Sequence, residues 1–119
     1  MIVMKFGGTS VGTGERISGV ARIAARVLED TATPPVVVVS AMSGVTDGLV
    51  RAATTAASGD KRTYRLIRDE LELRHEQAIA DCGIDSEHAR GLRAEIQTLL
   101  NWFENLCLSI STLGELTPR

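Results

Sequence analysis

The chain has 119 residues, room for one domain with a modest core, and its 44% hydrophobic and 24% charged residues are ordinary for a globular protein. A net charge of −2 and an aromatic content of 3% argue against a nucleic-acid partner. No apolar run approaches the roughly 20 residues that cross a bilayer, and no signal peptide is evident. Cys82 and Cys107 are too few for a disulfide framework and lack metal-ligand spacing. We therefore expect reduced thiols, a cytoplasmic location and no membrane partner.

The first expected element is a short strand over residues 1–4, which leads into the motif K-F-G-G-T-S-V-G, Lys5 to Gly12. A lysine followed by two glycines places a cation beside backbone that a ligand can approach without side-chain obstruction. Successive N–H groups of glycine, threonine and serine can form an anion-binding concavity, and the N-terminus of a following helix adds partial positive charge. The motif therefore predicts a polyphosphate site.

Two commoner phosphate motifs do not fit this stretch. In a Walker-type loop the lysine follows the glycines, whereas Lys5 precedes them. No register of the glycines supplies the G-x-G-x-x-G pattern of dinucleotide-binding proteins. A glycine-rich turn with a solvated lysine is the alternative interpretation.

A helix is expected over residues 14–29, with Thr13 as its N-cap, because apolar residues recur there at helical spacing. Three arginines fall off the apolar face and are interpreted as solvated: Arg16, Arg22 and Arg26. Residues 31–35 are expected to form a loop, because Pro34-Pro35 cannot continue a helix.

Val36 to Val39 form a continuous β-branched run, typical of a parallel strand that is buried on both faces. The run ends in the small residues S-A-M-S-G, Ser40 to Gly44, so the second strand repeats the arrangement of the first. In open α/β sheets, ligands bind beyond the carboxyl ends of the strands, and residues 5–10 and 40–44 both occupy that edge. The pattern predicts an α/β fold with its site there.

The rest of the chain is expected to be helical. A helix over residues 45–57 is followed by an apolar stripe from Tyr64 to Cys82 that ends at Gly83. Asp85 or Ser86 then caps a last helix, in which eight apolar residues alternate steps of three and four: Ala89, Leu92, Ile96, Leu99, Phe103, Leu106, Ile110 and Leu113. This heptad stripe predicts an antiparallel hairpin with coiled-coil-like packing. His75 and His88 are interpreted as packing or surface residues rather than ligands, and Trp102 as a core or interface residue rather than a base-stacking platform.

Four segments in chain order carry a family resemblance: K-F-G-G-T-S-V-G at Lys5, G-E-R-I at Gly14, V-V-V-V-S-A-M-S-G-V-T-D at Val36 and L-G-E-L-T-P-R at Leu113. Together they resemble the aspartate kinases of the amino acid kinase family. Residues 58–105 match in helical pattern rather than in motif.

The resemblance implies the N-terminal portion of an amino acid kinase domain. Residues 1–60 would be the nucleotide- and substrate-binding part of a three-layer α/β/α arrangement with parallel strands, and residues 61–113 a long antiparallel helical hairpin. Aspartate kinases are far longer, so the rest of the kinase domain and the ACT regulatory domains lie outside this chain. We expect half of a site, inactive by itself, and a homo-oligomer.

The activity implied is phosphoryl transfer from ATP, accompanied by Mg²⁺, to the β-carboxylate of L-aspartate, giving 4-phospho-L-aspartate for lysine, threonine and methionine biosynthesis. By match to the family motif, Lys5 is the catalytic residue that neutralises the transferring group. The phosphate-binding residues are Lys5, Phe6, Gly7 and Gly8. Four residues would contact substrate or nucleotide: Thr9, Ser10, Ser40 and Ala41. No residue is assigned as a metal ligand, and three residues are interpreted as the cap of helix 45–57: Ser43, Thr46 and Asp47.

Two alternatives of different class remain. One is a different member of the amino acid kinase family, acting on glutamate, acetylglutamate, carbamate or UMP, although T-S-V and S-A-M-S-G favour aspartate. The other is a non-catalytic module, in which the helical hairpin mediates assembly and the glycine loop is vestigial.

Overall fold

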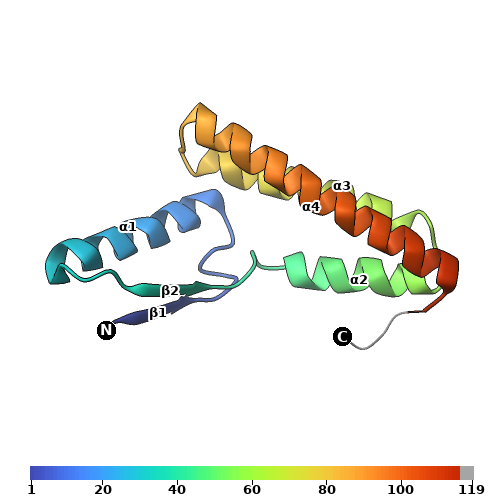
Figure 1. The fold of residues 1–119 in the computed structure, drawn as a ribbon, viewed down its shortest axis with the longest axis horizontal. Helices are drawn as coiled ribbons and strands as arrows, with labels where there is room; N and C mark the ends of the chain where they lie inside the picture. Colours follow the sequence, from blue (N-terminus) through green and yellow to red (C-terminus); the bar gives the residue numbers. More distant parts are fainter. Residues whose placement is uncertain (116–119) are drawn as a thin grey trace.

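The computed structural model describes residues 1–115, so the L-T-P-R end of the last sequence motif lies outside the described residues. The elements are β1 (Val3–Phe6), α1 (Gly14–Thr31), β2 (Val36–Val39), α2 (Val45–Ala57), α3 (Thr63–Asp81) and α4 (Ser86–Leu113). The molecule is elongated, with extents of 54 × 32 × 19 Å. The strands and α1 lie at one end, and α2 lies at the other beneath α4 (Figure 1). The mixed α/β character predicted from the sequence is confirmed.

β1 and β2 form a two-stranded parallel sheet in which Val3 pairs with Val36 and Phe6 with Val39. The connection between the strands is α1, which runs back alongside them (Figure 1). The prediction that β2 is buried on both faces is wrong for this chain, because its four valines are between 38% and 56% exposed. A parallel sheet is buried only when helices cover both of its faces, and two strands with one helix do not achieve this. The three-layer arrangement stays a prediction.

The helix ends follow local capping chemistry. Thr13 caps α1 as predicted, because its Oγ1 accepts the N–H of Arg16 at 3.2 Å. The helix continues beyond its expected end to Thr31, after which Ala32 adopts a left-handed conformation with φ of 54°. Asp85, rather than the residue after it, caps α4 through its carboxylate.

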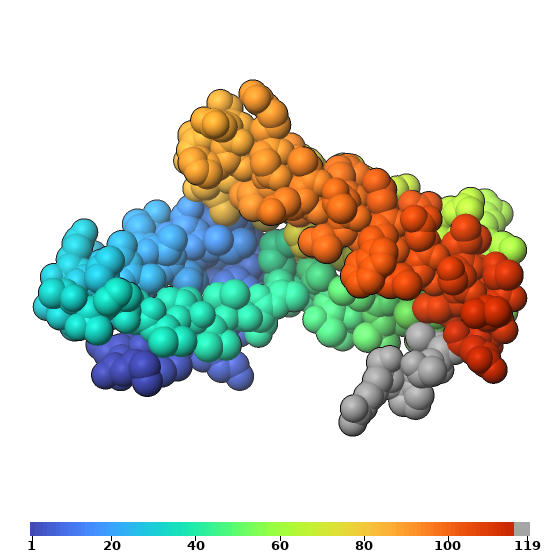
Figure 2. All heavy atoms as spheres, in the orientation of Figure 1, coloured from blue at the N-terminus to red at the C-terminus, as the bar shows by residue number. Residues whose placement is uncertain are grey.

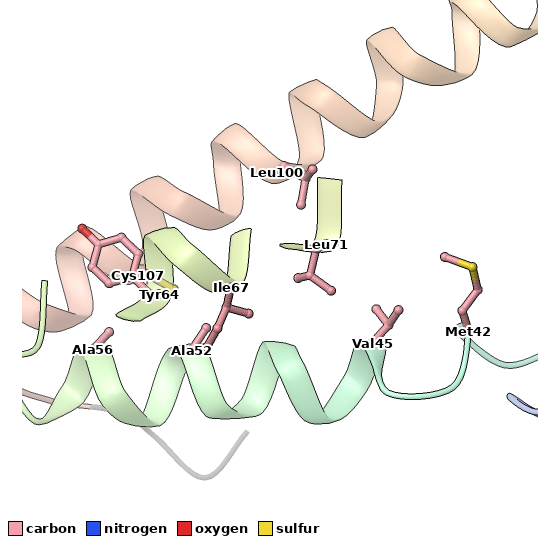
Figure 3. Packing of buried hydrophobic residues seen from close by; sticks show 9 residues of the cluster. All are labelled: Met42, Val45, Ala52, Ala56, Tyr64, Ile67, Leu71, Leu100 and Cys107. Atoms are coloured by element: carbon pink, nitrogen blue, oxygen red, sulfur yellow. The ribbon is translucent and has the colours of Figure 1, made fainter. Parts of the chain in front are cut away.

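The hydrophobic core lies between α2, α3 and α4 (Figure 3). Its buried members are Met42, Val45, Ala52, Ala56, Tyr64, Ile67, Leu71, Leu100 and Cys107. α2 presents alanines to the other two helices, and these small side chains let the helices approach closely. Tyr64 and Ile67 fill the space that the alanines leave, and both are almost fully buried.

A polar network joins α3 to α4 beside this core. The largely buried guanidinium of Arg68 donates to Gln97 Oε1 and Asn101 Oδ1, each at 2.9 Å, and pairs with Glu72 on its own helix. Its Nε lies 3.7 Å from a carboxylate oxygen of Glu104. One arginine thus links two turns of α4 to α3. Its directional hydrogen bonds fix the position of the two helices relative to each other, which hydrophobic burial alone does not do.

α4 is the longest helix, with 28 residues, yet neither it nor any other helix in the described part of the chain could cross a bilayer. Its predicted heptad stripe is divided between core and solvent. Leu100 and Cys107, which lie beside the predicted stripe, are buried, whereas four stripe leucines are exposed: Leu92, Leu99, Leu106 and Leu113. The reason is that α4 contacts α2 as well as α3, so its buried face turns toward a three-helix core and away from a two-helix seam.

Candidate functional site

β1 and β2 end side by side, and each is followed by a short segment that leads into a helix. We call these segments the first loop, residues 7–13, and the second loop, residues 40–44. Backbone hydrogen bonds tie them together: Ser40 N–H donates to the carbonyl of Phe6, and Ser43 N–H donates to the carbonyl of Gly8, both at 3.1 Å. The parallel register therefore brings both predicted parts of the site to the same edge, as the sequence analysis expected.

The two glycines of the first loop have different surroundings. A Cβ on Gly8 would lie 3.1 Å from the carbonyl oxygen of Ala41 and 3.3 Å from the backbone of Ser43. A Cβ on Gly7 would meet nothing within 4 Å. Neither has a positive φ, so left-handed backbone is not the reason for either glycine. Gly8 allows the close approach of the two loops, whereas the backbone at Gly7 is open to a ligand.

The first loop is folded on itself. Val11 N–H donates to the Gly7 carbonyl at 3.2 Å, and Gly12 N–H donates to the Thr9 carbonyl at 3.3 Å. The side chain of Val11 is buried, at 4% exposure, and anchors the loop against the protein. These contacts give the loop a folded conformation that does not depend on a ligand.

The side chains predicted to meet ligands are accessible. Lys5 shares one face of β1 with Val3, and both are exposed, while the alternate residues are less so. Within the described residues the Lys5 ammonium takes part in no ion pair. Four other predicted contact residues are also exposed: Thr9, Ser10, Ser40 and Ala41. Phe6 is half-buried and contributes its carbonyl to the link between the loops.

Arg16 is exposed, as the sequence analysis expected, but its guanidinium also contacts the first loop. Its Nη1 donates to the carbonyl oxygen of Thr9 at 2.6 Å, so the guanidinium reaches from the first turn of α1 back to the first loop. This contact places a permanent positive charge near the glycines and braces the loop. No sequence pattern indicated this hydrogen bond, because it depends on how the first loop folds back toward α1.

The start of α2 also differs from expectation. Its N-cap is Gly44, with φ of 86°, and no side chain makes the capping hydrogen bond. The interpretation of Ser43, Thr46 and Asp47 as cap residues is therefore wrong. All three side chains are exposed at the N-terminal end of the helix, beside the second loop. The partial positive charge of the helix N-terminus is thus directed at the candidate site without a capping oxygen.

Each loop is fixed to the helical part of the molecule at one point. Met42 of the second loop inserts its side chain into the core (Figure 3). At the end of the first loop, Gly14 lies so close to α3 that a Cβ there would overlap the carbonyl of Ala78. Ser18 Oγ donates to the carbonyl of Cys82 at 2.7 Å and holds the same junction. The sequence indicated neither anchor, because both depend on which helix packs against the loops.

Neither cysteine has the features of a reactive group, and the described residues contain no grouping of three or more His, Cys, Asp or Glu side chains that could hold a metal ion. Burial raises the pKa of both Cys82 and Cys107, and the nearby carboxylates of Asp81 and Glu104 add to the effect. Both therefore stay protonated thiols at neutral pH, as expected of packing residues.

The chain matches the model of the amino acid kinase family over residues 1–107, a stretch that includes both loops. It belongs to this family. A chloroplastic bifunctional aspartokinase/homoserine dehydrogenase 1 of Zea mays is 41% identical over 100 residues, which cover 82% of this chain and 10% of the maize protein. An aspartate kinase of Pseudomonas fluorescens (strain SBW25) is 50% identical over 62 residues, 52% of this chain and 14% of that protein. The aspartate kinase Ask_LysC of Stutzerimonas stutzeri (strain A1501) is 56% identical over 50 residues, 42% of this chain and 12% of that protein.

These similarities confirm the resemblance to aspartate kinases and place the chain in a family of phosphotransferases. The chain spans about a tenth of the length of the curated relatives it matches.

Proposed function

We propose that this chain supplies the phosphate- and substrate-facing part of an aspartate kinase site. In the reaction, a β-carboxylate oxygen of L-aspartate attacks the γ-phosphorus of ATP, the bond from that phosphorus to the β,γ-bridging oxygen breaks, and ADP leaves. The product is the acyl phosphate 4-phospho-L-aspartate. The observation that carries the proposal is the direct backbone link between the Lys5–Gly8 segment and the Ser40–Ser43 segment at the carboxyl edge of a parallel sheet.

The proposed roles follow from the surroundings of each residue. Lys5 neutralises charge on the transferring phosphoryl group, since its ammonium is exposed beside the first loop. Gly7 offers its backbone N–H to a phosphate oxygen, because the space where its side chain would be is open. Thr9, Ser10 and Ser40 supply hydroxyls for the nucleotide or aspartate.

Mg²⁺ is proposed to arrive with ATP and to neutralise phosphate charge when bound. The described residues hold no carboxylate cluster that fits it, so no residue of this chain is assigned as its ligand. Such ions are commonly held by one or two carboxylates together with the phosphates of the substrate.

The proposal also limits what this chain does alone. A kinase of this class must hold the adenine, the ribose and the amino group of aspartate, and this chain spans only about a tenth of its matched relatives. We therefore expect the 119-residue chain to lack turnover, and to act when joined to the remainder of an aspartate kinase. Cytoplasmic location and a role in lysine, threonine and methionine biosynthesis belong to the same proposal.

A chimera tests the assignment. Residues 1–107, which match the family model, replace the equivalent residues of the Pseudomonas fluorescens relative, and acyl phosphate is trapped with hydroxylamine while ADP release is measured. Aspartate-dependent turnover is the expected result. Activity only with glutamate, acetylglutamate, carbamate or UMP would instead assign another substrate, and no activity in a folded chimera would refute the proposed role.

The two lysines of the chain give a matched pair of variants. In the chimera, Lys5→Ala should lower kcat by two to four orders of magnitude, about 3–5 kcal/mol, because a charge that stabilises the transition state is lost. Lys61→Ala removes an exposed lysine far from the loops and should leave kcat unchanged. A Lys5→Ala chimera within tenfold of the parent would remove Lys5 from the mechanism.

A further inference from the structure

A cavity with charged walls lies between α2 and α3, at the end where the second loop enters α2. Its volume is about 250 Å³, and its floor is apolar because Ile67 and Leu71 line it. Figure 2 shows α4 in front of α3 and above α2, and no described residue of α4 lines the cavity. Two charged residues from each helix form the walls: Asp47, Arg51, Glu70 and Arg74. We call this space the α2–α3 cavity.

Only two of the four charges are paired with each other. α2 and α3 are consecutive helices that run in opposite directions (Figure 1), and Arg51 Nη2 lies 3.8 Å from Glu70 Oε2. One helical turn closer to the second loop, the same packing sets Asp47 opposite Arg74. These two side chains form no ion pair within 4.0 Å. The cavity therefore holds a gap between a carboxylate and a guanidinium.

Arg74 has no anionic partner elsewhere in the described part of the chain. It is half-buried and takes part in no ion pair there. Its guanidinium reaches the start of α2, because a Cβ on Gly44 would lie 3.0 Å from its Nη1. In a second cavity that Arg74 also lines, both carboxylate oxygens of Asp81 already accept from Gln77 Nε2 at 3.0 Å. A half-buried cation beside the positive end of a helix is unfavourable unless an anion joins it.

Gly48 keeps the floor of the cavity open. A Cβ there would lie 3.6 Å from Leu71 Cδ2 and 3.7 Å from Ile67 Cγ2, which is ordinary van der Waals contact. An alanine would therefore fit without strain and would favour the helix, so helix stability does not explain the glycine. The missing methyl group leaves space over the apolar floor.

We infer that the α2–α3 cavity binds the zwitterionic head of an α-amino acid with a short aliphatic side chain. The α-carboxylate lies against Arg74, whose planar guanidinium can donate two parallel hydrogen bonds to it. The α-ammonium donates to the carboxylate of Asp47. Both charged groups of the ligand are attached to one carbon atom, so one small molecule bridges the gap between the two side chains. The aliphatic side chain lies on Ile67 and Leu71.

Size and charge narrow the class of ligand. A volume of 250 Å³ holds about eight water-sized groups, and valine has about as many non-hydrogen atoms. The head group occupies Asp47 and Arg74, while Arg51 and Glu70 neutralise each other. A further carboxylate on the ligand would lie over the apolar floor without a partner, which disfavours aspartate. The cavity is thus separate from the proposed phosphoryl-transfer site, and Lys5 does not line it.

Titration of the 119-residue chain with L-valine is the first test. The backbone amide resonances of Gly44 and Gly48 should shift in a saturable way, with a dissociation constant in about the millimolar range expected for so small a ligand. Isobutylamine, which lacks the carboxylate, and isovalerate, which lacks the ammonium, should each bind at least about tenfold more weakly. L-aspartate should also bind at least about tenfold more weakly, because its β-carboxylate meets the apolar floor.

Substitutions address the cavity itself. Arg74→Gln should weaken valine binding at least about tenfold, and Arg74→Lys should retain part of the affinity because the charge remains. Gly48→Ala should also weaken binding, while the thermal midpoint of the free chain stays equal or rises. Arg26→Gln removes an exposed arginine of α1 and is the matched control, which should bind valine with unchanged affinity. Circular dichroism should show intact helices in all four variants.

Three results would overturn the inference. The first is a folded chain whose resonances show no saturable shift with valine. The second is an Arg74→Gln variant that binds valine as well as the parent, which would make Arg74 a solvated surface arginine. The third is equal affinity for valine and any of the three comparison ligands, which would refute the assignment of the head group or of the side chain. The chimera assay measures turnover at the two loops, so the proposed function and this inference can fail separately.

Discussion

The strands and α1 form one end of the molecule, where all four residues of β2 are exposed, whereas α2, α3 and α4 enclose nearly all of the buried hydrophobic side chains. The residues that are predicted to contact ligands lie at the other, poorly buried end. They are Lys5 and the hydroxyl residues of both loops. The loops depend on the helical end through two contacts, at Met42 and at Gly14. The residues that form the core and the residues predicted to contact ligands therefore lie largely at opposite ends of the molecule, and substitutions at the two ends should affect different measurements.

The largest effect on stability is expected in the helical core. Ile67 is 2% exposed and its neighbour Leu66 is 63% exposed. Ile67→Ala should lower the free energy of unfolding by about 2–5 kcal/mol, because it leaves a cavity between α2 and α3. Leu66→Ala should change it by no more than about 0.5 kcal/mol. Denaturant unfolding at one fixed protein concentration measures both, and equal costs would contradict the location of the core.

The next largest effect should come from the junction between the two ends. Gly14→Ala places a Cβ against the carbonyl of Ala78 and 2.7 Å from Asp81 Cβ, so α1 must move away from α3. We expect a loss of about 1–3 kcal/mol. Gly19→Ala in the same helix meets no atom closer than 3.8 Å and should stabilise by about 0.5–1 kcal/mol through helix propensity. If both substitutions stabilise, the two ends are not joined at Gly14.

The first loop offers a sharper division within the site itself. In Gly8→Ala the new Cβ would lie 3.1–3.3 Å from backbone atoms of Ala41 and Ser43, so the two loops must move apart. We expect a loss of about 1 kcal/mol in the free energy of unfolding and a lower activity of the chimera. Gly7→Ala should leave stability unchanged and raise the KM for ATP, because its Cβ occupies the open side of the loop. Equal thermal shifts for the two variants would show that Gly7 is a structural turn residue.

The smallest effect is a dependence on acid pH at the start of α3. Hydrogen bonds from the Thr63 hydroxyl and from the N–H groups of Thr63 and Arg62 lower the pKa of Asp60 from 3.8 to about 2. Because the folded pKa is the lower one, this stabilisation is complete above pH 3.8 and is lost as the pH falls toward 2. Asp60→Asn should remove that part of the pH dependence, measured as the thermal midpoint between pH 2 and pH 5. An unchanged slope would show that the carboxylate does not support the helix start.

Much of the architecture could be predicted because it depends on local chemistry. α2 has the bounds expected from its alanine-rich pattern, Thr13 caps α1, and Asp85, one of two predicted candidates, caps α4. These features depend on residues within a few positions of each other, so a single sequence contains the necessary information. The pairing of the two loops was predictable for a related reason, since parallel strands place their carboxyl ends together.

Two features could not be predicted, because they depend on which parts of the folded chain come into contact. Arg16 has the pattern of a solvated residue, yet its guanidinium bonds to the first loop across seven positions of the chain. The heptad stripe of α4 predicts a two-helix seam. Because α4 packs against α2 as well as α3, Leu100 is buried instead, and four leucines of the stripe stay exposed: Leu92, Leu99, Leu106 and Leu113.

The sequence by itself therefore determined the order of the strands and helices, the N-cap of α1 and the family, while the roles of Lys5 and the loop hydroxyls stay predictions. Tertiary structure alone decided which side of α4 is buried, that Gly8 serves loop packing while Gly7 stays open, and that Gly14 joins the two ends of the molecule. The physical reason is that periodicity shows how many apolar side chains a helix offers, whereas burial depends on how many neighbours the fold supplies to cover them.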